Sequence, residues 1–303
     1  MSTTVIANPC SAGGKTGSRV SAWRSLIEAA CGAIDVQLTS RAGEATELTR
    51  AALTAGAKRI VAVGGDGTFN EVANGFFDAT RKISDASLGF VPAGTGGDFR
   101  KTIGIPNDWA GAVALLSCAP RLIDVGRLTY TADEGERHRL FVNIASFGIG
   151  GLVDHYVNNS SKALGGTLAF AIATLKAGLR YQNARVELVV DGTKTEARIY
   201  NVAVANGRYF GGGMKVAPNA SVDDGQFDVV TLGDFSFGDL LRHGLDIYSG
   251  AHLNHPKVSV TRAKKVTATS RDGEVLLDVD GEQLGRLPAT FEMLPRALLV
   301  HAP

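Results

Sequence analysis

The stretch Ile60-Val61-Ala62-Val63-Gly64-Gly65-Asp66-Gly67-Thr68 decides the fold of this chain. It opens with a short apolar run rich in β-branched residues and bounded by glycines, which is typical of a buried strand. From residue 68 to residue 77, apolar side chains then recur at the spacing of one helix face. The stretch therefore predicts a strand over 59–63, a glycine loop and a helix over 68–77.

The same succession repeats through the first 125 residues. Further apolar runs predict strands over 4–7, 34–38 and 88–91, and helices are expected over 18–31 and 44–55. This alternation predicts a mostly parallel sheet with helices on both faces, in which ligands bind at the carboxyl ends of the strands. Nine of the 37 glycines follow three of the predicted strands: Gly13, Gly14, Gly17, Gly64, Gly65, Gly67, Gly94, Gly96 and Gly97.

The pattern changes after about Asp124, where longer alternating segments are separated by Asp-Gly turns. We therefore expect an α/β domain over 1–124, with three layers and a mostly parallel sheet, and a β-rich antiparallel sandwich over 125–289. The mainly antiparallel strands are predicted over 185–190, 194–205, 227–232 and 274–279, and two helices over 160–179 and 236–248.

Composition excludes several classes of protein. The 303 residues carry a formal net charge of +1, which argues against a nucleic-acid binder, and 45% of them are hydrophobic, which argues against disorder. No apolar run is long enough to span a membrane. Three cysteines without a close pair and an N-terminus without a secretory signal predict free thiols and a cytoplasmic location. The sequence leaves the oligomeric state open, a homodimer included.

Three well-known motifs are excluded because a required glycine is missing from each. Gly14-Lys15-Thr16 lacks the earlier glycine of a Walker loop, because Pro9 stands there. Ser146 lacks the glycine two residues before it that a nucleophile elbow requires. No third glycine completes a dinucleotide fingerprint in either of the later glycine loops. The loop 64–68 remains, and from its residues alone an anion site and an ordinary turn with an N-capping Asp66 are equally good interpretations.

Five blocks together give this sequence a resemblance to the diacylglycerol kinase catalytic-domain family, which comprises bacterial soluble lipid kinases related to diacylglycerol, sphingosine and ceramide kinases. The third block departs from the usual pattern, because Gly97 stands where the family has Asn and Ala93 where Leu is common. The blocks are Asn8-Pro9-Cys10-Ser11-Ala12-Gly13-Gly14, Gly64-Gly65-Asp66-Gly67-Thr68-Phe69-Asn70-Glu71, Pro92-Ala93-Gly94-Thr95-Gly96-Gly97-Asp98-Phe99, Ala217-Pro218-Asn219-Ala220-Ser221-Val222-Asp223-Asp224-Gly225-Gln226-Phe227 and Asp280-Gly281-Glu282.

The resemblance implies an ATP-dependent lipid kinase that acts transiently at a membrane surface, with its active site in the cleft between the two domains. It implies that the C-terminal segment, 290–303, returns to the first domain. It also implies a set of ATP-binding residues: Asn8, Thr39, Gly64, Gly65, Asp66, Gly67, Thr68, Asn70 and Thr95.

By the same resemblance, Asp66 and Asp98 would organise the catalytic Mg²⁺ and the phosphates, and Glu282 would be the general base for the lipid hydroxyl. The Asp224 carboxylate and the main-chain carbonyls of Ser221 and Gln226 would hold a second, structural Mg²⁺, an ion that prefers oxygen ligands.

Alternatives stay open at this point. One is a kinase for a soluble acceptor such as NAD, and another is a nucleotide-binding sensor without catalysis. His252 and His255 have the spacing of a metal pair but no evident third ligand, so ordinary packing is favoured for them. The run Gly211 to Gly213 is interpreted as a hinge or a plain flexible connection.

Overall fold

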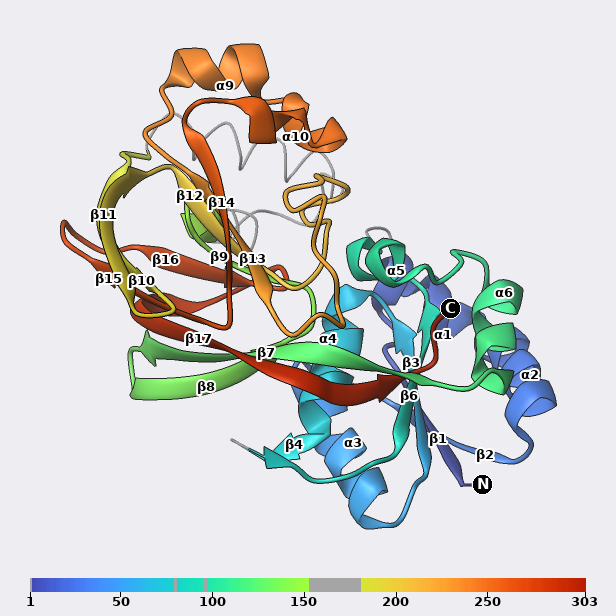
Figure 1. Ribbon diagram of the computed structural model, residues 1–303. Helices are drawn as coiled ribbons and strands as arrows, with labels where there is room; N and C mark the ends of the chain where they lie inside the picture. The colour runs from blue at the N-terminus through green and yellow to red at the C-terminus, as the bar shows by residue number, and fades with distance from the viewer. Residues whose placement is uncertain (1, 79–80, 95–96, 153–180) are drawn as a thin grey trace. The chain divides into compact units, whose positions relative to one another are not determined.

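The computed structural model describes residues 2–78, 81–94, 97–152 and 181–303 of the chain (Figure 1). Two compact units are present. The N-terminal unit contains residues 1–125, 222–225 and 294–303, and the C-terminal unit contains residues 126–221 and 226–293. The N-terminal unit thus takes in one short loop and the last residues of the chain, both from beyond the middle of the sequence.

A parallel sheet forms the centre of the N-terminal unit, as predicted. Leu299 and Val300, at the end of the last strand of the chain, pair in parallel with Ser87 and Leu88 of β6. The strands lie in the order β2 (Ile34–Leu38), β1 (Thr3–Ala7), β3 (Arg59–Gly64), β6 (Ser87–Pro92) and the end of β17 (Glu282–Val300).

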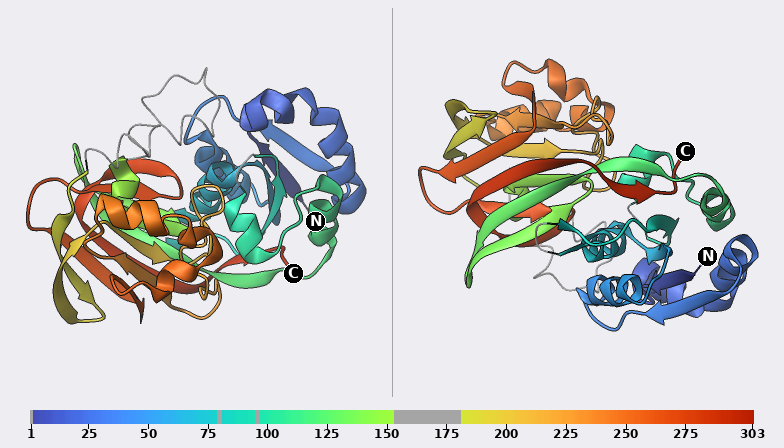
Figure 2. Two further views of the ribbon diagram at one scale, coloured as in Figure 1. Left: turned by 90° about the horizontal axis from the view of Figure 1, so that it is seen from above. Right: turned by 60° about the horizontal axis from the view of Figure 1, so that its bottom comes forward.

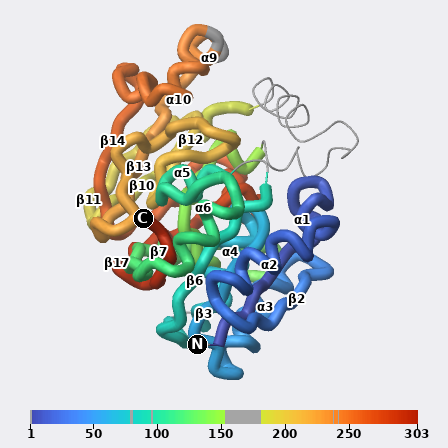
Figure 3. Tube along the Cα trace, turned by 90° about the vertical axis from the view of Figure 1, so that its right-hand side faces the viewer, coloured from blue at the N-terminus to red at the C-terminus, as the bar shows by residue number. Residues whose placement is uncertain are grey.

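Helices cover both faces of this sheet. On one face, Trp23 of α2 and Val113 of α6 belong to a buried cluster with Val61 and Val63 of β3, and α2 and α6 lie side by side (Figure 3). The helices and short elements of this unit are η1 (Ser11–Gly14), α1 (Lys15–Ser18), α2 (Val20–Cys31), α3 (Glu44–Thr54), α4 (Asp66–Gly75), β4 (Phe77–Asp78), β5 (Arg81–Lys82), α5 (Asp98–Ile103), α6 (Trp109–Ala114) and η2 (Leu115–Ser117).

Aromatic packing holds α4 on the other face. The Phe69 ring lies 4.8 Å from the ring of Phe90 in β6 and 5.1 Å from that of Phe99 in α5, measured between ring centroids. α4 begins at Asp66, earlier than the predicted 68, because Gly65 with φ −91° and ψ −174° is the last extended residue. The glycine loop therefore leads directly into the first turn of this helix.

The C-terminal unit is β-rich and antiparallel, as predicted. Its core includes Phe141, whose ring stacks on Phe227 at 5.5 Å, and Phe147, whose ring stacks on Phe291 at 5.8 Å. β7 and β17 are its two long strands and run side by side (Figure 2). The other strands are β8 (Gly135–Phe141), β9 (Ile144–Gly148), β10 (Ala184–Val190), β11 (Thr193–Ile199), β12 (Asn201–Ala205), β13 (Phe227–Leu232), β14 (Val258–Ala263), β15 (Lys265–Ser270) and β16 (Leu276–Val279), and β7 covers Arg121–Ala132.

Two predicted elements are divided in the structure. The strand expected over 194–205 breaks at Tyr200, whose amide donates to the carbonyls of both Leu232 and Gly233. β11 therefore pairs with β10, whereas β12 pairs with β13 and β9. The helix expected over 236–248 forms α9 (Phe237–His243) and α10 (Asp246–Ser249), interrupted at Gly244, a poor helix former. η4 (Ala251–Asn254) follows it. The helix predicted over 160–179 lies outside the described residues.

Candidate functional site

The carboxyl ends of the parallel strands carry the residues that the sequence singled out. Asn8 follows β1, Thr39 follows β2 and the glycine loop follows β3. A cavity of about 240 Å³ lies at this edge of the sheet, close to the lower end of the size range of small-molecule sites. Three of its lining residues, Asn8, Thr39 and Thr68, were predicted to hold a nucleotide; the others are Cys10, Ser40, Arg41, Ala42, Ala45 and Glu71.

Backbone hydrogen bonds fix the first two strand ends. The Asn8 amide donates to the carbonyl of Val63 at 3.0 Å, and the Asn8 Oδ1 accepts from the Cys10 amide at 2.9 Å. The Thr39 amide donates to the carbonyl of Ala7 at 2.9 Å, and only 8% of Thr39 is exposed. The cavity wall is therefore tied to the sheet itself.

The glycine loops after β3 and β6 lie against each other. A Cβ atom placed on Gly94 would come within 2.8 Å of the Gly65 Cα, and the Ala93 amide donates to the Gly64 carbonyl at 2.6 Å. A Cβ atom on Gly64 would lie 2.5 Å from the Thr68 hydroxyl oxygen. Side chains at these positions would force the loops apart, so the close approach requires glycine.

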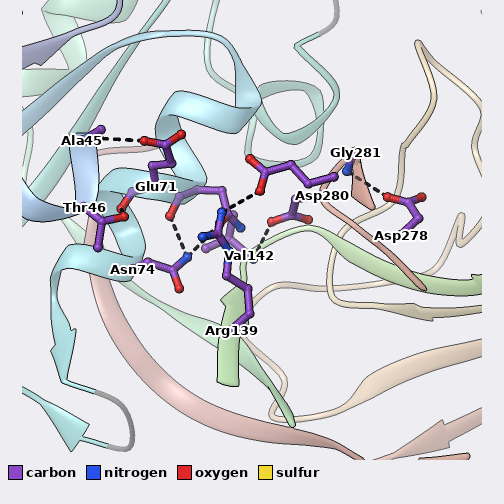
Figure 4. A network of polar contacts seen from close by, with 11 residues as sticks. Ala45, Thr46, Glu71, Asn74, Arg139, Val142, Asp278, Asp280 and Gly281 are labelled. Carbon is purple, nitrogen blue, oxygen red and sulfur yellow. Dashed lines mark hydrogen bonds and ion pairs between the residues drawn. The ribbon is translucent and has the colours of Figure 1, made fainter. Parts of the chain in front are cut away.

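Glu71 lies on α4 and lines the cavity, although it was not among the residues predicted to bind the nucleotide. Its Oε2 accepts from the Ala45 amide at 3.2 Å, and its carbonyl accepts from the Thr46 hydroxyl at 2.8 Å (Figure 4). The available signal was its spacing of three residues from Thr68, which places both on the same side of the helix. The cavity thus has one acidic side chain, Glu71, and one basic side chain, Arg41, among neutral residues.

Asp66 and Asp98 are brought together at the first turns of α4 and α5. The Asp66 Oδ2 accepts from the Asp98 amide at 2.7 Å, and Lys101 Nζ lies 3.0 Å from Asp98 Oδ1. Burial, more than the neighbouring charge of Asp98, raises the pKa of Asp66. The buried Asp66 Oδ1 has no hydrogen-bond partner among the described residues. A buried carboxylate oxygen without a partner is costly, and a divalent cation with oxygen ligands fits it.

The loop 221–226 carries the residues predicted for a second cation. Its Gly225 amide donates to the Oδ2 of Asp124 at 2.6 Å, and the carbonyl of Val222 accepts from the Asp124 amide at 2.6 Å. Asp124 is fully buried, and its pKa is raised first by burial and then by the charges of Asp224 and Asp223. These three acids repel one another, which suits a bound cation.

The predicted set at this loop, Ser221, Asp224 and Gln226, supplies one carboxylate and two main-chain carbonyls. No group of three or more His, Cys, Asp and Glu side chains with the arrangement of a metal site occurs in the described part of the chain. Asp124 was missed by the sequence reasoning, although an acid inside the apolar run of β7 was a signal.

Glu282 is the first residue of β17 and pairs with Val279 across an Asp-Gly turn. Its Oε2 accepts from the Arg139 Nη2 at 2.9 Å, and 38% of the Glu282 side chain is exposed (Figure 4). The ion pair with Arg139 therefore orients a carboxylate that stays partly exposed.

The structure also describes most of the other residues that the sequence singled out. His252 is buried, and its Nε2 lies 3.0 Å from the Val216 carbonyl oxygen. The run Gly211 to Gly213 forms a turn, which Phe210 and Met214 close with two backbone hydrogen bonds of 3.0 Å. All three glycines have positive φ. The three cysteines are free thiols, and Thr95 lies outside the described residues.

Comparison with known proteins identifies the two parts of the chain. The family model for the diacylglycerol kinase catalytic domain matches residues 2–128, and the model for the YegS C-terminal NAD kinase beta sandwich-like domain matches residues 143–302. A protein of Pseudomonas putida named probable lipid kinase YegS-like is 34% identical over 89% of this chain and 85% of its own length. A diacylglycerol kinase of Staphylococcus aureus is 30% identical over 88% of this chain and 81% of its own.

Solved structures have the same fold. A crystal structure of a diacylglycerol kinase from Bacillus anthracis superposes with a TM-score of 0.73 at 22% identity, covering 100% of this chain and 97% of that one. A second structure from the same organism superposes with a TM-score of 0.80 at 24% identity, covering 100% and 95%.

Proposed function

This chain belongs to the diacylglycerol kinase catalytic-domain family, and from that premise we propose that it transfers the γ-phosphoryl group of ATP to a hydroxyl group of diacylglycerol or a related lipid. Phosphoryl transfer requires a positioned nucleotide, neutralised phosphate charge and a base for the attacking hydroxyl. The observation that carries the proposal is the cavity lined by Asn8, Thr39 and Thr68, at the strand ends that also place Asp66.

The chemistry of the cavity supports one orientation of the nucleotide. The ionised Glu71 carboxylate accepts hydrogen bonds and repels phosphate, so the ribose hydroxyls are its natural partners. The glycine loop from Gly64 to Gly67 and the N-terminus of α4 favour negative charge. We therefore place the ribose beside Glu71 and Ala45, and the phosphates toward the start of α4.

Asp66 and Asp98 are the residues that we assign to the catalytic metal. When bound, Mg²⁺ would neutralise charge on the transferring phosphoryl group. The unpartnered Asp66 Oδ1 is available to it, whereas Oδ2 is held by the Asp98 amide. The bond from the Asp98 amide to Oδ2 holds the Asp66 carboxylate in place. Asp66 would therefore present Oδ1 to the metal without a rearrangement of its loop. At the loop 221–226, we assign Ser221, Asp224 and Gln226 to a structural Mg²⁺.

Glu282 is our candidate for the general base. Its carboxylate takes the proton of the lipid hydroxyl while that oxygen forms a bond to the γ-phosphorus and the bond from the γ-phosphorus to the bridging oxygen of ADP breaks. The lipid phosphate and ADP are the products. Arg139, which donates to Glu282 at 2.9 Å, holds the carboxylate in one orientation before the substrate arrives.

A lipid acceptor requires the protein to reach a membrane surface. None of the helices in the described ranges is both long and apolar enough to cross a membrane. We therefore propose that the protein works in the cytoplasm and associates with the membrane only transiently, through its lipid substrate.

The test is a transfer assay. The protein is incubated with labelled ATP, Mg²⁺ and a panel of lipids in mixed micelles, and each labelled product is identified by mass. We expect a lipid monophosphate whose rate of formation falls about 10²–10⁴-fold when the Glu282→Gln variant replaces the wild type. Transfer to no lipid would refute the proposal.

A soluble acceptor is the second candidate, because the model that matches residues 143–302 describes a sandwich like that of NAD kinases. The same assay therefore includes NAD without detergent. Transfer to NAD and to no lipid would make this the function, whereas ATP binding without any transfer would indicate a nucleotide sensor.

A further inference from the structure

Two Asp-Gly turns of the C-terminal unit have the same backbone. Asp280-Gly281 joins β16 to β17, and Asp191-Gly192 joins β10 to β11. The aspartates have φ values of +50° and +44°, and both glycines have φ +86°. Positive φ at both central residues is typical of two-residue hairpin turns, and Asp tolerates it better than most residues because its short side chain can form hydrogen bonds. Such hydrogen bonds can support each aspartate in this conformation.

In both turns the aspartate carboxylate is that support. The Asp280 carboxylate accepts three backbone hydrogen bonds. One comes from the Val142 amide at 3.0 Å (Figure 4), and the others come from the amides of Asn143 at 3.2 Å and Ile144 at 2.8 Å. The Asp280 amide in turn donates to the Ile144 carbonyl at 3.0 Å. Hydrogen bonds from backbone amides to an ionised carboxylate are about twice as strong as neutral ones. The turn is therefore clamped to the corner between β8 and β9.

The other turn is clamped in the same way to a different corner. The Asp191 carboxylate accepts from the amides of Lys264 at 3.1 Å and Lys265 at 2.8 Å, between β14 and β15. Thr193 follows this turn, in the position that Glu282 has after the first. The two turns thus share a mechanism of support and differ in the residue that they carry.

The corner that clamps Asp280 also supplies Arg139. This arginine lies on β8 and donates to Glu282 Oε2 at 2.9 Å, and the corner 142–144 follows directly at the end of that strand. The far side of the turn is held as well, since Asp278 Oδ1 accepts from the Gly281 amide at 3.0 Å. The segment 139–144 therefore holds both the turn that carries Glu282 and the Glu282 carboxylate.

We propose that Asp280 is the positioning residue for Glu282: it fixes the hairpin on which the base is carried by binding the three amides of the β8–β9 corner. This inference rests on the proposed function of Glu282. A displacement of about 1 Å can cost about 10²-fold in rate, so loosening the turn lowers kcat even though Glu282 itself is kept. Nucleotide binding, which we assign to the N-terminal unit, is unaffected.

The experiment compares Asp280→Asn with its matched control, Asp191→Asn. Each change keeps the size of the side chain and places an amide group opposite a backbone donor. We expect Asp280→Asn to lower kcat by about 10–10²-fold with the KM for ATP unchanged, and Asp191→Asn to leave both near wild type. Equal losses in the two variants would overturn the inference, because the effect would then be a general loss of stability.

A double-mutant cycle separates positioning from structure. If Asp280 acts through Glu282, Asp280→Asn has almost no further effect on kcat in a Glu282→Gln background. Full additivity of the two losses would refute the inference. Should Asp280→Asn fail to fold, Asp278→Asn weakens the bond to the Gly281 amide, together with the bond from the Ser146 hydroxyl at 3.3 Å, and is expected to give a smaller loss with the same non-additivity.

Hydrogen exchange tests the inference without an activity assay. In the ligand-free protein, Asp280→Asn is expected to speed amide exchange over residues 142–144 and 281–283, and Asp191→Asn over residues 192–193 and 264–265. Unchanged exchange around Glu282 would overturn the positioning role. If the wild type phosphorylates no lipid, the proposed function fails, whereas the exchange result still decides whether Asp280 fixes this hairpin.

Discussion

The two units hold their candidate functional residues in position by different means. In the N-terminal unit the cavity wall is backbone: the Asn8 and Thr39 amides are bonded to neighbouring strands, and Gly94 and Gly65 touch where side chains would not fit. In the C-terminal unit Glu282 is held by charged side chains, Arg139 at its carboxylate and Asp280 at its turn. Substitutions should therefore act through backbone spacing in the first unit and through removal of charge in the second.

The largest effect is expected at Asp66, the acid of the N-terminal unit that we assign to the catalytic metal. Asp66→Asn should lower kcat by at least about 10²–10⁴-fold, since it removes the oxygen assigned to the metal. The variant should nevertheless be more stable than the wild type in metal-free buffer. Transfer assays and thermal unfolding measure the two effects, and normal activity in a folded variant would refute the assignment.

The sign of the stability change follows from the pKa of Asp66. Burial raises this pKa above its ordinary value of 3.8, so the folded chain holds the proton more tightly than the unfolded chain. The resulting stability is fully present at pH values below 3.8 and is lost as the pH rises through the folded pKa. At neutral pH the ionised carboxylate therefore destabilises the metal-free protein. Mg²⁺ should raise the Tm of the wild type more than that of the variant.

Glu282→Gln tests the charge-based arrangement of the C-terminal unit. We expect a loss of about 10²–10⁴-fold in kcat, the usual range for a general base, with ADP affinity unchanged. Glu196→Gln, on β11 of the same unit, is the control, since 62% of its side chain is exposed. A comparable loss in the control, or near wild-type turnover in Glu282→Gln, would contradict the role.

Gly94→Ala tests the backbone-based arrangement. The added methyl group would meet the Gly65 Cα at 2.8 Å and separate the two glycine loops. We expect kcat/KM for ATP to fall about 10–10²-fold, with the change largely in KM. In Gly238→Ala, the matched control, the added Cβ meets only the Ser236 hydroxyl oxygen at 3.7 Å, so unchanged kinetics are expected there. Unaltered ATP kinetics in Gly94→Ala would show that the loops do not need this contact.

The smallest effect concerns the end of the chain. His301 is 2% exposed, with its two ring nitrogens 3.0 Å from the Cys118 carbonyl and 2.9 Å from the Ser87 hydroxyl. Burial, with a smaller contribution from Arg59, lowers its pKa below 6.5. The stability due to neutral His301 is therefore present above pH 6.5 and is lost as the pH falls through the folded pKa.

Urea unfolding at several pH values measures this contribution. His301→Gln should reduce the fall in unfolding free energy that the wild type shows below about pH 6.5. The partly exposed His138, replaced in the same way, serves as the control. An identical pH dependence in wild type and His301→Gln would show that this histidine does not contribute.

Much of the N-terminal unit could be predicted because its signals are local. Apolar runs gave β1, β2, β3 and β6, and the glycine loops gave the position of the cavity. Glu71 was missed because its role depends on the Ala45 amide, which the fold brings to it from another helix. α4 was expected to start too late, since the extended backbone of Gly65 is not evident from the sequence.

The C-terminal unit was less predictable because its contacts join distant residues. Asp280 and Ile144 are 136 positions apart in the sequence, and neither has a pattern that points to the other. The break at Tyr200 depends on carbonyls from β13 and the residue after it. From spacing alone, Asp280-Gly281 is one of several Asp-Gly turns between predicted strands, so the function of Glu282 rested on the family resemblance.

The path of β17 determines whether the N-terminal unit can be expressed as a separate fragment. Its first residue is Glu282, and its last residues complete the parallel sheet beside β6, with Leu298 and Val300 fully buried. A fragment ending at residue 125 would lack this strand and leave the apolar edge of β6 open to pairing with other chains. The N-terminal unit should therefore aggregate when expressed alone, and become soluble when residues 294–303 are supplied through a short linker.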